Sequence, residues 1–351
     1  MLLEAIIIQS SRAFQKERSI SAIFHLLKGK ASIQTVQDSQ TYRLTAFYGI
    51  YPSLTKQTFE QIIHELIKHQ YLSYVSNQQT GYPTKQGLHW FKDIKQALPL
   101  KHYQGFLYHK TDQIFYLRLL LMIQVLTNRL MNETSYIPIV DDPAILNWMK
   151  HVYPSLKHEP KRYLQALYEE LTQCLEQCDE QAAHLFVDRI TTYQHYGMSL
   201  DQLAYTYQIK RTDLPLWFTA IIHQILKQIT AKKEAYPFLN QILTGLSVNG
   251  MMTQSAQKTY EWIQKQYSLA EIARLRRLKL STIYDHLVEI ALFDKQFSIR
   301  PYVSEQVQHE IIQAVKATKS FKLKTIKDHV SDDISYFQIR LTLAATDIEL
   351  E

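Results

Sequence analysis

The sequence predicts a mainly α-helical protein, and three observations support this fold class. Glycine is scarce, with 8 residues among 351, whereas helix formers such as Leu, Gln and Lys are abundant. Apolar side chains recur at the 3.6-residue spacing of amphipathic helices throughout residues 105–247. The segment Ser268–Leu287 reads as two short helices joined by a tight turn, which is a helix-turn-helix. We expect three parts, which span residues 1–100, 101–250 and 251–351.

The first part begins with three predicted helices and continues into a β-hairpin. Apolar spacing predicts the helices over residues 20–27, 44–48 and 56–70. Alternating side chains from Tyr71 predict a strand, a polar turn ends at Gly81, and Tyr82–Gly87 returns as a second strand. Three helices followed by a hairpin is the order of a winged helix, so residues 1–100 are expected to form one.

Two surfaces of this winged helix are candidates for contact with nucleic acid. The outer face of its third helix is polar and basic, with Lys56, Gln57, Gln61, His64 and Lys68. Aromatic side chains flank the turn of the hairpin. We expect Tyr74 to anchor the hairpin and Tyr82 to be the one available for stacking on a base.

The middle part is expected to be helical throughout, with prolines near the helix ends. Its helices are predicted over residues 114–130, 144–151, 161–177, 181–196, 200–207, 214–229 and 236–246. Cys174 and Cys178 lie four residues apart, a helical spacing that suits a disulfide poorly, so we expect buried or half-buried thiols. The most apolar run, Ile114–Leu126, is too short to span a bilayer, and no internal repeat is evident.

Capping residues and apolar spacing define the helices of the third part. Ser268 and Glu271 are expected to form a capping box, and Ser281 to cap the second helix. The side chains expected on the buried faces are Ile272, Ala273 and Leu275, then Ile283, Leu287 and Ile290. A short strand or wing is expected over residues 293–299, followed by helices over 305–317, 323–329 and 335–346.

The outward side chains of the helix-turn-helix set the kind of DNA contact to expect. On the second helix they are Thr282, Tyr284, Asp285, His286 and Glu289. Two of these five are carboxylates, which argues against strong reading of DNA bases. Candidate phosphate contacts lie on or after the first helix, at Arg274, Arg276, Arg277 and Lys279. Arg277 stands where such turns usually carry glycine, so either the turn differs or a basic group is wanted there.

The net charge of +6 is unevenly distributed. Residues 1–130 hold 15 basic and 7 acidic side chains, residues 131–257 hold 10 and 13, and residues 258–327 hold 13 and 7. Two basic zones with an acidic body between them can attract phosphate, although the same charges can also simply solvate helix faces. In the second zone the candidates for a nucleic-acid groove are Lys319, Lys322 and Lys324; the alternative is a role at helix ends.

The two terminal parts resemble accessory modules of RecQ-type helicases. The C-terminal part is similar to their helix-turn-helix domain through Leu269–Ala273, Leu280–Leu287, Leu323–Lys327 and Ser335–Leu341. The N-terminal part resembles their winged helix through Leu26–Gly29, Phe47–Gly49, Ser53–Thr55, Tyr71–Leu72 and Thr84–Gly87. The whole chain resembles the YpbB-like helix-turn-helix proteins of bacteria. This resemblance implies a RecQ-type helicase as a partner in trans, and a wing that works at duplex ends.

Motifs for catalysis are missing from the sequence. No G-x-x-x-x-G-K-[ST] loop exists, since Gly29-Lys30 lacks the upstream glycine and is followed by Ala31. The 14 histidines form no H-E-x-x-H arrangement, and the carboxylates of Asp141-Asp142 precede a predicted helix, where acidic residues act as caps. We expect no enzyme activity, no metal and no cofactor.

The expected function is therefore that of a DNA-binding accessory protein that acts with a separate RecQ-type helicase in DNA repair or recombination. Two alternatives stay open. One is a protein-interaction scaffold in which Asp285 and Glu289 face a basic partner, and the other is a transcription regulator. The N-terminus shows no signal peptide, so we expect a soluble, cytoplasmic protein associated with the nucleoid and not with a membrane. The oligomeric state is left open.

Overall fold

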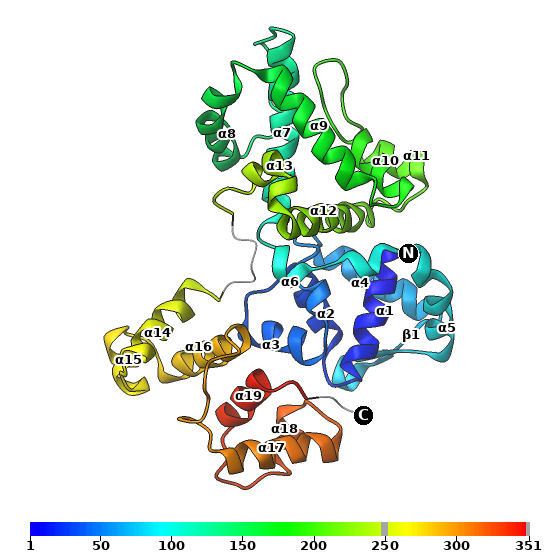
Figure 1. The fold of residues 1–351 in the computed structure, drawn as a ribbon. Helices are drawn as coiled ribbons and strands as arrows, with labels where there is room; N and C mark the ends of the chain where they lie inside the picture. The colour runs from blue at the N-terminus through cyan, green and yellow to red at the C-terminus, as the bar shows by residue number, and fades with distance from the viewer. Residues whose placement is uncertain (247–251, 349–351) are drawn as a thin grey trace.

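The computed structural model describes residues 1–246 and 252–348, and the expected boundary at residues 250–251 lies outside this range. The described chain is mainly helical, as predicted, and contains one two-stranded antiparallel sheet within this range. Figure 1 shows the helices of the middle part stacked at one end, above two terminal modules that lie side by side.

The N-terminal module follows the predicted order of three helices and a hairpin, with an additional helix on each side. Its elements are α1 (Leu2–Phe14), α2 (Ile20–Lys28), α3 (Ile33–Thr41), a 3₁₀ turn (Thr45–Phe47), α4 (Lys56–Lys68), β1 (Leu72–Val75), β2 (Thr80–Pro83) and α5 (Lys85–Ile94). β1 pairs with β2 in the register that sets Leu72 opposite Pro83, and Ser19 adds an isolated bridge to Thr80.

Two local predictions for this module were wrong, and its first helix was not predicted. The second helix is α3 and not residues 44–48, which form only the 3₁₀ turn; the buried side chains of α3 include the polar Gln37, Asp38 and Ser39, so apolar spacing could not identify it. The returning strand ends at Pro83, because Thr84 accepts a hydrogen bond from the Gly87 N–H and starts α5. The first helix, α1, is buried on nearly all sides and so lacks the one-sided pattern of an amphipathic helix.

The middle part is a stack of helices in which the predicted starts are more accurate than the predicted ends. Its helices are α6 (Gly105–Tyr108), α7 (Asp112–Leu130), α8 (Pro143–Leu156), α9 (Pro160–Leu175), α10 (Glu180–Asp188), α11 (Leu200–Tyr207), α12 (Leu214–Ala231) and α13 (Pro237–Ile242). Asp142 caps α8 by accepting from the Ala144 and Ile145 N–H groups, as its position before a helix indicated. None of the described helices combines the length and apolar character needed to cross a membrane.

The C-terminal module contains two units of three helices. The first unit comprises α14 (Gln254–Gln264), α15 (Leu269–Leu275) and α16 (Leu280–Phe293), and the second comprises α17 (Glu305–Thr318), α18 (Leu323–Lys327) and α19 (Tyr336–Ala345). Residues 293–299 form no strand, contrary to the prediction. The last helices of the two units, α16 and α19, pack against each other (Figure 1).

The two terminal modules contact each other directly, so the middle part is not a spacer between them. α3 packs against both α16 and α19, and the Gln37 side-chain amide donates to the Arg340 carbonyl over 2.9 Å. Glu17 accepts from the Phe321 backbone N–H over 3.0 Å. The rings of Phe106 and Phe293 stack with centroids 5.2 Å apart. These contacts join the C-terminal module to the N-terminal module and, through Phe106 of α6, to the start of the middle part.

Candidate nucleic-acid interface

The turn between α15 and α16 has the geometry of a helix-turn-helix. The predicted capping box at the start of α15 is confirmed, since Ser268 accepts from the Glu271 N–H and Glu271 accepts from the Ser268 N–H. Arg277 has a φ of 53°, so the left-handed turn position is present and is occupied by a residue with a Cβ. α16 begins at Leu280 with Lys279 as its N-cap, so the prediction that Ser281 caps this helix was wrong.

Arg276 does not extend into solvent as a phosphate contact. Its guanidinium donates to the Ser255 carbonyl over 2.7 Å and also to the Ser255 and Thr259 hydroxyls. The Thr259 hydroxyl in turn lies 2.8 Å from Nδ1 of His286. Arg276 therefore ties the end of α15 to α14, which is a structural role.

His286 belongs to the buried face of α16 and not to its outward face. It lies three residues after Ile283 and four before Ile290, and both of these side chains are buried. Burial lowers the pKa of His286, and the neighbouring charge of Arg276 lowers it further. A neutral imidazole can accept at Nδ1 from the Thr259 hydroxyl. The placement of His286 among the DNA contacts was therefore wrong.

The remaining outward positions of α16 are partly covered by the second unit. The ring of Tyr284 stacks on Phe337 of α19 with centroids 4.1 Å apart, and Asp285 accepts from Arg340 over 2.8 Å. Glu289 accepts from the Thr253 backbone N–H and hydroxyl, and its burial raises its pKa. Thr282 is half-buried. As a result, several outward side chains of α16 are already engaged within the protein, which limits base reading by this face.

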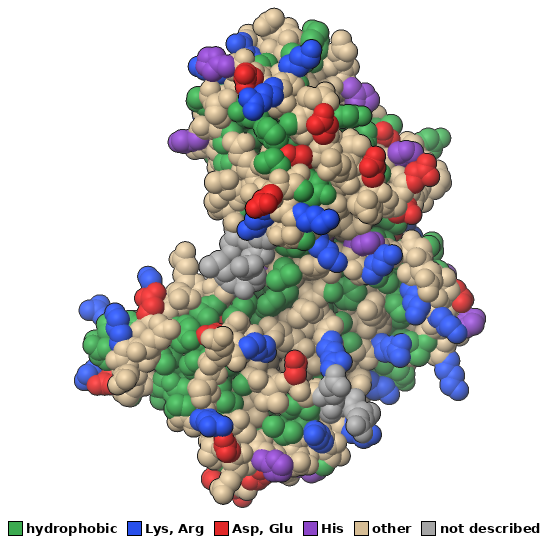
Figure 2. Space-filling model, in the orientation of Figure 1, with side chains coloured by type: hydrophobic (Ala, Val, Ile, Leu, Met, Phe, Trp, Pro, Cys, Tyr) green, Lys and Arg blue, Asp and Glu red, His purple; other side chains and the backbone are tan. Residues whose placement is uncertain are grey.

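The tip of this unit is exposed, and cations alternate with leucines there. Arg274, Arg277 and Lys279 are exposed, and so are Leu275 at 50% and Leu280 at 40%. Leu275 was expected in the core, but α15 ends at this residue and its side chain is left outside. Figure 2 shows blue cationic groups around a green apolar area at the end of the molecule that α14 and α15 form in Figure 1.

The second basic run lies on the surface between α17 and α18. Lys319, Lys322 and Lys324 are exposed; Lys319 is the C-cap of α17, where a cation complements the helix dipole. Phe321 is buried and makes an edge-to-face contact with Tyr42 of the N-terminal module. Phe321 is therefore not available on this surface to stack on a base.

The outer face of α4 lies fully on the surface. Lys56, Gln57 and Lys68 are exposed, together with the neighbouring Gln61 and His64. The Lys56 ammonium lies 3.6 Å from the Glu60 carboxylate, a weak exposed pair. Figure 2 shows many Lys and Arg side chains over the N-terminal module.

The exposure of the two aromatic side chains of the hairpin is the opposite of that predicted. Tyr82 is half-buried, with the Lys16 ammonium 3.8 Å above its ring centroid. Tyr74 is 43% exposed on β1 and is the aromatic that can meet a ligand. Successive residues along a strand point to opposite faces, so Tyr74, opposite Gly81, and Tyr82, opposite Ser73, lie on different faces of the hairpin. The packing of α1, α4 and α5 on the hairpin decides how much of each face is covered.

The described part of the chain holds no group of three or more His, Cys, Asp or Glu side chains that could bind a metal ion. Cys174 is buried and Cys178 is half-buried, as predicted, and both are free thiols. Burial raises the pKa of Cys174 to about 12 and that of Cys178 to about 11, so both thiols stay protonated near neutral pH.

Comparison with known proteins relates the whole chain to one bacterial protein. Residues 255–343 match the family described as a helix-turn-helix domain, a type that suggests DNA binding, and this match includes both three-helix units. The protein YpbB of Bacillus subtilis (strain 168) is 31% identical over 328 residues, which cover 93% of this chain and 92% of that protein. No solved structure matches the chain. The similarity extends over nearly the full length of both proteins, and the chain belongs to the YpbB family.

Proposed function

We propose that this chain is a non-enzymatic DNA-binding protein that acts with a separate RecQ-type helicase in DNA repair or recombination. One observation carries the DNA-binding half: the exposed cations Arg274, Arg277 and Lys279 surround the turn of a helix-turn-helix. The exposed face of α4 offers a second basic surface on a module packed directly against the first.

The geometry favours contact with the phosphate backbone over reading of bases. Tyr284 and Asp285 of α16 are engaged by α19, whereas the cations at the tip are not covered. Phosphate contacts orient a protein on DNA without selecting its sequence. Removing one cation that binds a phosphate should reduce the slope of log K against log salt by about 0.9.

Fluorescence anisotropy with forked and blunt duplexes tests DNA binding. We expect salt-dependent binding in the micromolar range or tighter, and a loss of about tenfold or more when Arg274 and Arg277 are both replaced by Glu. The matched control reverses the exposed Lys232 and Lys233 of the middle part and should change binding little. Arg276 is left intact because its replacement would disturb the fold. Absence of salt-dependent binding to either duplex would contradict the proposal.

The helicase half of the proposal is supported by the resemblance of both terminal modules to accessory modules of RecQ-type helicases. A RecQ-type helicase on a separate chain would supply the motor with which these accessory modules act. Co-purification with a RecQ-type helicase from the same cell tests the partnership, and unwinding of forked DNA with and without this chain tests its consequence. We expect association and faster unwinding. No association and no change in unwinding rate would leave a DNA-binding protein without this partner.

A protein-interaction scaffold is the second candidate, and the exposed leucines of the tip favour it. Leu275 and Leu280 lie between cations, an arrangement that suits a partner segment with apolar and acidic side chains. Replacing both leucines by Ser separates the two functions. A scaffold predicts loss of helicase association with DNA binding intact. A transcription regulator has less support, because the covered face of α16 limits base reading.

A further inference from the structure

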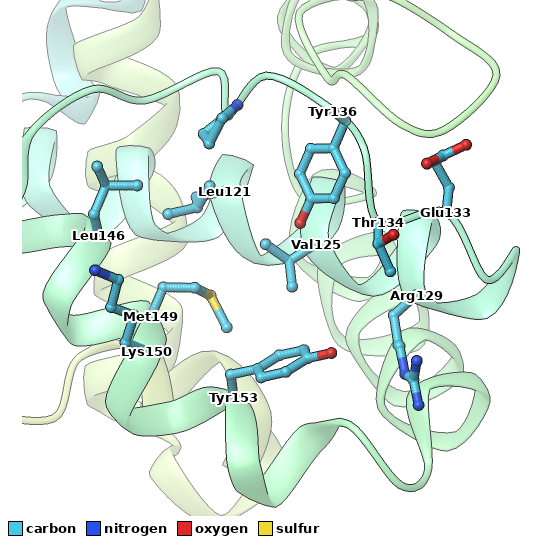
Figure 3. Close-up of a pocket in the computed structure, with 11 residues that line it drawn as sticks. Leu121, Val125, Arg129, Glu133, Thr134, Tyr136, Leu146, Met149, Lys150 and Tyr153 are labelled. Carbon is cyan, nitrogen blue, oxygen red and sulfur yellow. The ribbon is translucent and has the colours of Figure 1, made fainter.

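The middle part contains an open pocket between α7 and α8. The proposed DNA contacts lie on other parts of the chain, the N-terminal and C-terminal modules. Its volume is about 340 Å³, within the range of small-molecule sites. Figure 3 shows Leu121 and Val125 of α7 and Leu146 and Met149 of α8 around its centre. These four side chains give the pocket an apolar floor.

The wall of the pocket is held in place before any ligand binds. The loop that joins α7 to α8 crosses the pocket, and the buried Gln124 of α7 anchors it at two points. The Gln124 side chain donates to the Ile137 carbonyl over 3.0 Å and accepts from the Ile139 N–H over 2.9 Å. Because both the nitrogen and the oxygen of this amide bind the loop, the loop that carries Tyr136 is held in place, and little ordering is needed on binding.

The polar groups of the pocket are mostly hydrogen-bond donors. Figure 3 shows the Tyr136 hydroxyl pointing into the pocket and the Tyr153 hydroxyl pointing toward the side on which Arg129 lies. Burial raises the pKa of Tyr136, so its hydroxyl keeps its proton. Arg129 donates through Nε to the Lys157 carbonyl, and no described carboxylate lies within ion-pair distance of its guanidinium. The one carboxylate of the lining, Glu133, accepts from the Ser135 N–H.

We propose that this pocket binds a small amphiphilic carboxylate, with its apolar chain on the floor and its carboxylate at Arg129 and the Tyr153 hydroxyl. A ligand that supplies acceptors matches a site rich in donors, and a planar carboxylate matches a guanidinium in particular. Lys150 lies at the opposite end of the pocket. A ligand with its carboxylate at Lys150 would lie in the reverse orientation.

Isothermal titration calorimetry with sodium octanoate tests this site, with octan-1-ol as the neutral probe of the same chain length. We expect octanoate to bind the full chain with a Kd of about 0.1–1 mM and octan-1-ol to bind at least roughly tenfold more weakly. Arg129→Gln should weaken octanoate binding roughly tenfold. The matched control, Lys150→Gln, removes the same charge from the other end and should leave the Kd within about twofold.

A third variant, Met149→Trp, fills the floor of the pocket and should abolish binding while the circular dichroism spectrum is retained. If this variant does not fold, the comparison of Arg129→Gln with Lys150→Gln and the comparison of octanoate with octan-1-ol still test the site. The proposal is overturned if octanoate shows no saturable binding, if octan-1-ol binds as well as octanoate, or if both charge variants weaken binding equally.

Discussion

Replacing Arg277 by Gly should stabilise the protein and weaken its binding to DNA. Arg277 has a positive φ of 53°. Among the described residues, it is the only one in the turn between α15 and α16 that does. Its side chain is exposed, so no packing in the fold requires an arginine there. A strained position that is filled by a cation points to a use for that charge.

The size of the effect follows from two opposing terms. A left-handed backbone costs a residue with a Cβ about 1–2 kcal/mol relative to its relaxed conformation. Glycine avoids this strain but loses about 0.5–1 kcal/mol more in backbone entropy on folding. The net gain should be about 0.5–1 kcal/mol. Removing this one phosphate-binding cation should at the same time reduce the salt slope of DNA binding by about 0.9.

Three variants separate strain from charge. Arg277→Gly relieves the strain and removes the charge, and Arg277→Gln keeps the strain while it removes the charge. Gln266→Gly relieves a similar strain, at φ 65°, in the turn before α15 and changes no charge. We expect greater resistance to urea for both glycine variants, and weaker DNA binding by fluorescence anisotropy for both Arg277 variants only.

Two results would refute this reasoning. A lower stability of Arg277→Gly would mean that the arginine makes a favourable interaction that the positive φ does not reveal. Unchanged DNA affinity and salt slope in both Arg277 variants would mean that this cation meets no phosphate. The charge would then only solvate the turn.

Three further predictions address the fold and the wing. Because burial lowers the pKa of His286, its contribution to stability is complete above the unfolded pKa of about 6.5 and is lost as pH falls below it. His286→Gln should therefore lose less stability than the parent between pH 7.5 and 5 in urea titrations, and parallel losses would contradict this. Asp213 is buried and accepts from two backbone N–H groups at the start of α1, so Asp213→Ala should cost about 2–3 kcal/mol by thermal unfolding. The exposed Asp201→Ala should cost under about 1 kcal/mol, and equal losses would refute a special role for the buried carboxylate. Tyr74→Ala should weaken binding to forked DNA by about 1–3 kcal/mol in anisotropy assays. Tyr82→Ala should change it less, and the reverse order would show that the ring under Lys16 is the one that meets DNA.

Elements with strong local signals could be predicted from the sequence. α11 begins and ends at Leu200 and Tyr207, as apolar spacing predicted, and a capping box of Ser199 and Gln202 stabilises its start. The capping box of α15 was predicted for the same reason. Such signals involve side chains and backbone groups within one helical turn, so neighbours in sequence suffice to recognise them.

Predictions failed where burial depends on contacts between distant segments. α3 is buried through polar side chains, of which Gln37 bonds to the C-terminal module and Asp38 to Arg18, and α1 is buried on nearly all sides, so neither has the expected one-sided pattern. Arg276 is separated in sequence from Ser255, whose carbonyl it binds, and its position on a basic run could not reveal that bond. The pocket of the middle part likewise depends on a loop anchored by Gln124.

The helical character of the chain and the helix-turn-helix of its C-terminal part could be recognised from the sequence, because composition, spacing and caps act over a few residues. The positive φ of Arg277, which the sequence left open, and the exposure of the side chains in that unit follow from the folded structure. α19 lies about 50 residues after α16 and covers Tyr284 and Asp285. Arg276 is bound by a backbone carbonyl of α14. Exposure is a property of the packed chain, because long-range contacts determine which of several possible faces is removed from water.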